Sequence, residues 1–96
     1  MGATQKAPRV LFTNISASTL IRTGVGTFWG FYVNSTSSGV LVIYDSLSAA
    51  GTKIMNTVTP AIGPHIFNFG VEFNTGLYVS LSSGSIDMTV FWRPRE

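Results

Sequence analysis

The chain has 96 residues, of which 45% are hydrophobic and only 10% are charged, and its formal net charge is +2. An ordinary soluble domain has roughly a quarter charged residues, so this composition leaves little surface for water. Polar residues and glycine interrupt every apolar run before the roughly 18 residues of a membrane-spanning helix, and the absence of cysteine excludes disulfides and thiolate metal sites. We therefore expect a single domain that buries part of its surface in an assembly, with no membrane partner.

The first eight residues lack the apolar core of a secretory signal, so we expect an extended N-terminal arm and synthesis in a host cytoplasm. Beyond the arm, apolar and polar residues alternate with period two and helical spacing is nowhere sustained, which predicts an all-β chain. A small-residue loop is expected at 46–52 and a proline-containing connection at 57–65. The expected strands are 8–14, 18–23, 27–33, 40–44, 53–57, 65–73, 77–82 and 86–92. Seven or eight strands at this spacing predict a single antiparallel β-sandwich over residues 1–96, jelly-roll-like in topology.

Two of these strands, 27–33 and 40–44, lack a water-facing side. In the first we assign the unbroken set, Trp29, Phe31 and Val33, to the core, which leaves Phe28, Gly30 and Tyr32 on the other face. A contiguous apolar patch of this kind usually marks an interface, although a long loop could also cover it. The interface residues that we predict are Phe28, Tyr32, Leu41 and Ile43, with Phe91 on the last strand.

The residues that could support catalysis are few and scattered. His65 is the single histidine, and Asp45, Glu72 and Asp87 lie on separate predicted strands or strand ends, so no acid–base pair is indicated and we expect no enzymatic activity. The same scatter gives no chelating spacing, so no metal ion is expected. The glycines of 24–30 open a strand instead of the helix that a dinucleotide fingerprint requires, so no cofactor is expected.

Four of the six cations lie near the chain ends: Lys6, Arg9, Arg93 and Arg95. They do not form the basic stripe with interleaved aromatics that nucleic-acid binding requires, so we expect no nucleic-acid partner and assign these cations to an acidic protein surface. A small carbohydrate-binding sandwich is an alternative, because exposed Phe28, Tyr32 or Tyr78 could stack on sugar rings.

Several short elements carry a resemblance to a known family over residues 28–92. They are Tyr32-Val33-Asn34-Ser35-Thr36, Tyr44-Asp45 with Ser48-Ala49-Ala50-Gly51-Thr52, Asn56-Thr57 with Thr59-Pro60-Ala61, and Thr75-Gly76-Leu77-Tyr78. In this order the chain resembles the small all-β virion structural proteins of tailed bacteriophages of aquatic bacteria, cyanophages included. It departs from that pattern at His65, where a more apolar or aromatic residue is expected at the start of the strand, and at the Arg93-Pro94-Arg95-Glu96 end.

The resemblance implies a capsid decoration, or cement, protein on the exterior of the virion. Such a protein binds the shell of the major capsid protein as a homo-oligomer, a trimer or a dimer, and stabilises it. A position in the tail or baseplate stays open, and the resemblance carries over no catalytic residues.

Overall fold

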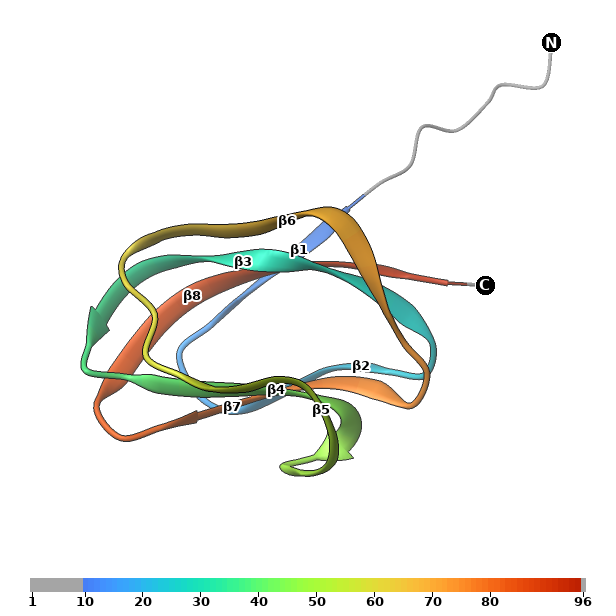
Figure 1. Ribbon diagram of the computed structural model, residues 1–96, viewed down its shortest axis with the longest axis horizontal. Coiled ribbons are helices and arrows are strands. Elements are labelled where there is room, and N and C mark those ends of the chain that lie inside the picture. The colour runs from blue at the N-terminus through green and yellow to red at the C-terminus, as the bar shows by residue number, and fades with distance from the viewer. Residues whose placement is uncertain (1–9, 96) are drawn as a thin grey trace, which may run out of the picture.

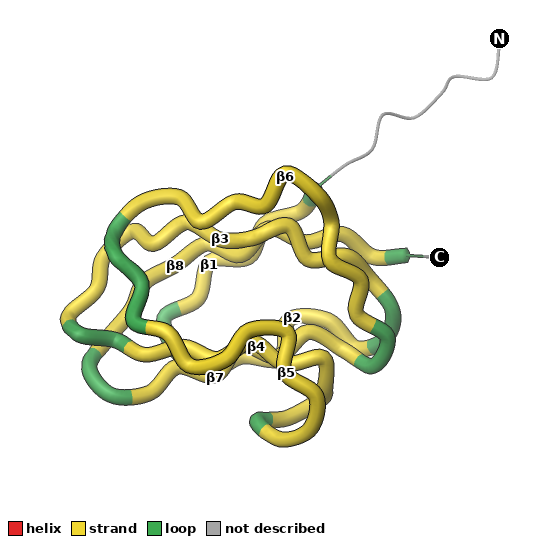
Figure 2. Tube along the Cα trace, viewed as in Figure 1, coloured by secondary structure: helices red, strands yellow, loops and turns green. Residues whose placement is uncertain are grey.

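Residues 10–95 are described by a computed structural model, in which they form eight strands and no helix (Figure 1). The strands are β1 (Leu11–Ile15), β2 (Thr19–Thr23), β3 (Gly26–Ser37), β4 (Val40–Ser48), β5 (Ala50–Val58), β6 (Gly63–Phe73), β7 (Gly76–Ser82) and β8 (Ser85–Pro94). They form two facing four-stranded antiparallel sheets, β1-β8-β3-β6 and β2-β7-β4-β5 (Figure 2). The predicted all-β sandwich is confirmed, while the predicted arm lies outside the described residues.

The strand pairing follows jelly-roll order. Strand β1 pairs with β8, β2 with β7, β3 with β6 and β4 with β5, so the chain folds back on itself about the β4–β5 hairpin. Pairing of β3 with β8 and of β4 with β7 joins these four pairs into the two sheets. The sheet edges are therefore β1, β6, β2 and β5, and each sheet has two central strands that must bury one face.

The core lies between the two sheets and is apolar throughout. Its fully buried side chains come from both central strands of each sheet and from β6, because inward positions alternate with outward ones along each strand. They include Phe28, Phe31, Val33, Leu41, Ile43, Phe73, Leu77, Val79, Met88 and Val90.

The alternation of β3 changes phase at Gly30. The registers of β3 against both β6 and β8 shift between Phe28 and Gly30, which marks a β-bulge. Gly30 has a φ of +119°, and a Cβ atom at this position would collide with the carbonyl oxygen of His65. Only glycine fits this backbone. Phe28 before the bulge and Phe31 after it therefore both point into the core.

This bulge overturns part of the predicted interface. Phe28, predicted on the exposed face, has no exposed surface, while Trp29, predicted in the core, is only half-buried. Leu41 and Ile43 of β4 are also fully buried, so the prediction that they form an exposed patch is wrong. A strand with apolar residues on both sides does not reveal by pattern which side faces the partner sheet.

The segment 46–52, predicted as a loop, forms the tip of the β4–β5 hairpin instead. Strand β4 continues to Ser48 and β5 begins at Ala50, with Asp45 paired to Thr52. Backbone hydrogen bonds do not need large side chains, so pairing extends beyond the apolar run. In Figure 1 this tip bends away from the sandwich.

Asp45 holds the turn between β6 and β7, where the chain crosses from one sheet to the other. Its carboxylate accepts hydrogen bonds from the backbone N–H groups of Thr75 at 2.8 Å, Asn74 at 3.0 Å and Gly76 at 3.3 Å. Partial burial opposes ionisation of the carboxyl, but the three donors, Thr75 first, outweigh it and lower the pKa of Asp45.

Stability should therefore depend on this carboxylate in acid. Because the pKa of Asp45 is lower in the folded chain than in the unfolded chain, its contribution is full above the unfolded pKa of about 3.9 and is lost as pH falls through the folded pKa. We expect Asp45→Asn to lower the free energy of unfolding at pH 7 by about 1 kcal/mol and to flatten its decline below pH of about 4. Urea unfolding at neutral and acidic pH measures both, and an unchanged acid decline contradicts this role.

The phase of β3 is tested by two substitutions on opposite sides of the same strand. Phe28→Ala opens a cavity beside Phe67, whose ring packs edge-on at 5.5 Å, and should lower the free energy of unfolding by about 3–5 kcal/mol. Tyr32→Ala, on the outer face, should cost less than about 1 kcal/mol. Chemical denaturation compares the two, and equal costs would mean that the bulge does not divide the strand in this way.

Candidate functional site

Inward and outward side chains alternate regularly along strand β8. Ile86, Met88 and Val90 are buried, so the alternate residues of this regular strand lie on the outer face of the β1-β8-β3-β6 sheet. In chain order these outward residues are Asp87, Thr89, Phe91 and Arg93.

An apolar row crosses this outer face at the level of Phe91. Residues that pair directly across strands share a face, and Phe91 pairs with Phe12 on one side and with Gly30 on the other. Gly30 pairs in turn with Ile66 of β6. We call the exposed or half-buried apolar set on this side the aromatic face: Val10, Phe12, Trp29, Tyr32, Ile66 and Phe91.

The aromatic face is exposed and slightly hollowed. Phe12 is 72% exposed, Ile66 51% and Tyr32 41%, which is unusual for large apolar side chains. Val10, Trp29, Ile66 and Phe91 line a shallow depression of about 270 Å³. The Trp29 ring lies over Gly70 of β6, where a Cβ atom would stand 3.1 Å from the indole. A side chain at residue 70 would crowd this indole and, more closely, the methyl group of Thr27.

A polar group, which we call the Asp87 cluster, adjoins the aromatic face at one end and consists of Asn14, Asn34, Asp87 and Thr89. The amide nitrogens of Asn14 and Asn34 donate to Oδ1 of Asp87 at 2.9 and 3.0 Å and reach Oγ1 of Thr89 at 3.4 and 3.3 Å. The Asn14 amide, followed by that of Asn34, lowers the pKa of Asp87. The cluster therefore holds an ionised carboxylate across β1, β8 and β3 at this end of the face.

Cations occupy the opposite end of the same face. Arg93 points outward from β8 and its backbone pairs with Thr27, which pairs in turn with Glu72. Arg95 forms an ion pair with Glu72 at 2.6 Å, whereas Arg93 forms none with any residue between 10 and 95. The face thus runs from a carboxylate through aromatic rings to a guanidinium that forms no ion pair within residues 10–95.

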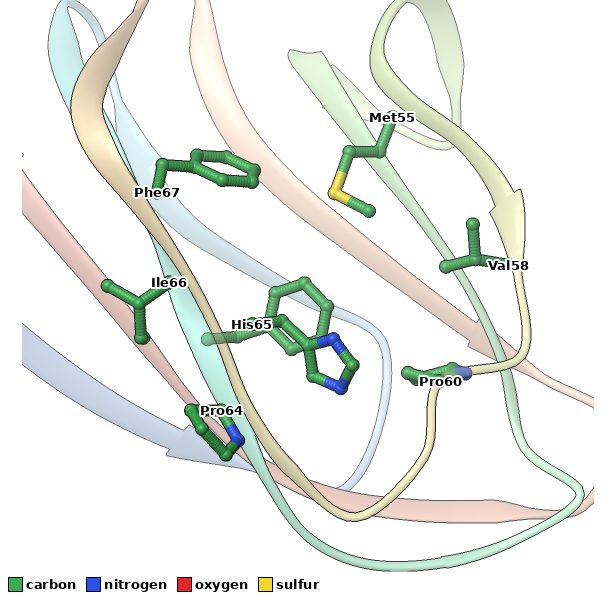
Figure 3. A pocket seen from close by; sticks show the side chains of 8 residues that line it. Met55, Val58, Pro60, Pro64, His65, Ile66 and Phe67 are labelled. Atoms are coloured by element: carbon green, nitrogen blue, oxygen red, sulfur yellow. The ribbon is translucent and has the colours of Figure 1, made fainter.

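A second concave feature lies between the sheets where edge strands β5 and β6 do not pair. It is an apolar cleft of about 400 Å³, and Figure 3 shows Met55 and Val58 on one wall facing Phe67 and His65 on the other. The His65 ring stacks on Phe31 at 4.9 Å, and its Nε2 lies 2.9 Å from the carbonyl oxygen of Ala61. His65 thus packs as an edge residue of the core.

The predicted interface residues fall into four groups. Tyr32, Phe91 and Arg93 lie on the outer face of the β1-β8-β3-β6 sheet, whereas Phe28, Leu41 and Ile43 belong to the core. Arg95 is paired with Glu72. Lys6 and Arg9 lie outside the described residues.

Sequence reasoning missed four members of the aromatic face: Val10, Phe12, Trp29 and Ile66. Phe12 and Ile66 come from short or irregular strands that do not look two-sided, and their proximity to Phe91 depends on the register of two strand pairs. The available signal was Phe91, an aromatic residue on the polar side of an otherwise alternating strand.

No protein-family model, curated protein or solved structure matches this chain. Within residues 10–95, no group of three or more His, Cys, Asp or Glu side chains is placed to hold a metal ion. The same residues include no helix of the length and apolarity needed to cross a bilayer.

Proposed function

We propose that this protein is a non-enzymatic structural subunit that self-associates through its aromatic face, and that it decorates the outside of a bacteriophage capsid. The observation that carries the self-association is the apolar row Phe12, Phe91, Trp29 and Ile66 on the outer face of the sheet, in which Phe12 and Ile66 are exposed and Phe91 and Trp29 are half-buried. Monomeric proteins rarely expose apolar patches larger than a few hundred Å², and larger ones mark interfaces.

The capsid role rests on the resemblance of residues 28–92 together with two features that suit it. Only 10% of the residues are charged, so much of the surface is apolar. Permanent burial of part of that surface, as in a virion, removes it from water and is therefore favourable. The jelly roll is used by many capsid proteins, although the fold alone does not define a function. The partner is the major capsid protein, whose acidic residues pair with the two N-terminal cations, Lys6 and Arg9.

The proposed mechanism is that binding to the assembled shell shifts the equilibrium between shell and free subunits towards the shell. A protein that binds the assembled shell and not its separated subunits stabilises the shell by mass action. An oligomer engages several capsid subunits at once, which raises its apparent affinity without new contacts. Burial of the aromatic face contributes about 25 cal/mol per Å², less the cost of association.

Self-association is tested first by the mass in solution. We expect light scattering to show a dimer or trimer for the native chain and a monomer for Phe12→Ser/Ile66→Ser, because each lost side chain removes about 1.5–3 kcal/mol of burial. Leu20→Ser is the matched control, since Leu20 is 40% exposed but lies on the other sheet. A native monomer at all concentrations would overturn the proposed self-association.

The capsid role is tested with shells of the major capsid protein encoded in the same genome. We expect the native protein to sediment with these shells saturably and to raise the temperature at which they break apart. The Phe12→Ser/Ile66→Ser variant should bind at least tenfold more weakly, since it has lost multivalency. Absence of shell binding, or binding to isolated tails instead, would overturn the capsid assignment; binding to tails would favour a tail or baseplate subunit.

A carbohydrate-binding module is the second candidate, and the Asp87 cluster favours it. Tyr32 lies beside this cluster. An aromatic ring in this position can stack on a pyranose, while the neighbouring carboxylate and amide oxygens accept hydrogen bonds from the sugar hydroxyls. Under this alternative, neutral oligosaccharides bind saturably by calorimetry and Tyr32→Ala abolishes the binding.

A further inference from the structure

We infer that the aromatic face is covered by a second copy of this chain, related by a two-fold axis that runs across the strands and pairs Asp87 of each copy with Arg93 of the other. This inference rests on the proposed self-association. It adds the identity of the facing elements and the geometry of the dimer.

The order of outward residues along β8 carries the argument. Asp87, Thr89, Phe91 and Arg93 follow one another on one face of a regular strand, with opposite charges at the two ends. At about 3.4 Å per residue these ends are about 20 Å apart. A two-fold axis midway between Thr89 and Phe91 places β8 antiparallel over its own copy, so each Asp87 faces an Arg93.

Both charges are available for such pairing. Asp87 is held by the neutral amides of Asn14 and Asn34, and it forms no ion pair with the residues that the structure describes. Arg93 likewise has no ionic partner among them, although Arg95, two positions further, is neutralised by Glu72. One negative and one positive charge thus stand at opposite ends of an apolar surface.

The same axis suits the uncharged middle of the face. It brings the row containing Phe91 and Trp29 of one copy over the row containing Thr89 and Tyr32 of the other, because these rows lie on either side of the axis. Sheets that pack face to face lie about 10 Å apart with strands aligned to within about 30°. An extended arginine side chain can reach a carboxylate across that distance.

The charge order also selects between the two ways of placing a two-fold axis in this plane. An axis parallel to the strands would keep each row at its own level and bring Asp87 near Asp87 and Arg93 near Arg93. Like charges facing each other in an interface are strongly unfavourable. Only the axis across the strands brings each Asp87 close to an Arg93 of the other copy. As with any two-fold axis, the same surface of both copies then forms the interface.

Two charge reversals test the pairing. Alone, Asp87→Arg places arginine against arginine and Arg93→Asp places aspartate against aspartate, so we expect each variant to dimerise at least tenfold more weakly than the native chain. When the two variants are mixed, every facing pair is again opposite in charge, and a heterodimer should form with near-native affinity. Sedimentation equilibrium measures the masses, and the double variant Asp87→Arg/Arg93→Asp should dimerise with itself.

Controls separate charge pairing from damage to the fold and from net charge. Circular dichroism and thermal unfolding of each variant report on the fold, and Asp87→Asn, which keeps the shape and one acceptor oxygen, should weaken dimerisation and reduce its salt dependence. Lys53→Asp makes the same charge change as Arg93→Asp on an exposed residue of the opposite sheet and should leave the dimer intact.

The outcomes distinguish this inference from the proposal on which it rests. A native monomer overturns both. A native trimer, or a native dimer whose affinity is unchanged by both reversals, overturns the two-fold pairing and leaves self-association standing. Failure of the mixed variants to associate, with both folded, also overturns the pairing.

Discussion

The sandwich depends on the bulge at Gly30 in the middle of β3. This strand lies between β8 and β6, so its side chains supply both the core and the outer face of the sheet. Strict alternation would keep Phe28 and Phe31 on opposite sides of the sheet. One irregular residue with positive φ brings both rings inward and turns Trp29 outward, at the cost of a position that only glycine can occupy.

The chain is too short to cover the outer faces of its own sheets. Eight strands enclose a single core, and none of the described elements packs over the outer surface of either sheet. On the β2-β7-β4-β5 sheet, the central outward row is Leu20, Tyr78, Tyr44 and Lys53. Tyr44 is buried and Tyr78 half-buried in this row, and at its β5 edge the exposed Lys53 carries a charge into water. On the β1-β8-β3-β6 sheet the corresponding row is Phe12, Phe91, Trp29 and Ile66. The first row therefore includes a charged side chain that water can solvate, whereas every side chain of the second row is apolar.

Strand β8 joins the core to the proposed interface. Its inward residues, among them Met88 and Val90, hold the two sheets together, while its outward residues run from a carboxylate to a guanidinium through a threonine and a phenylalanine. Asn14 and Asn34, from the two neighbouring strands, fix the carboxylate in place. A surface that is apolar in the middle and oppositely charged at its ends is complementary to a copy of itself rotated by 180°. A second copy of the chain can therefore cover this face without a different protein.

The sequence by itself determined the all-β class, a count of seven or eight strands with their approximate positions, and the small share of charged residues available for the surface. Strand period and turn residues are local properties, so "GLYVSLS" and "SIDMTVFW" identify two strands and the turn between them without reference to the rest of the chain. Tertiary structure alone decided which side of each doubly apolar strand faces inward. Phe28, Leu41 and Ile43 entered the core because the bulge at Gly30 and the position of the opposite sheet set the inward direction. It also decided that Phe12, Phe91 and Ile66 meet, because cross-strand neighbours depend on register between segments as much as 79 residues apart.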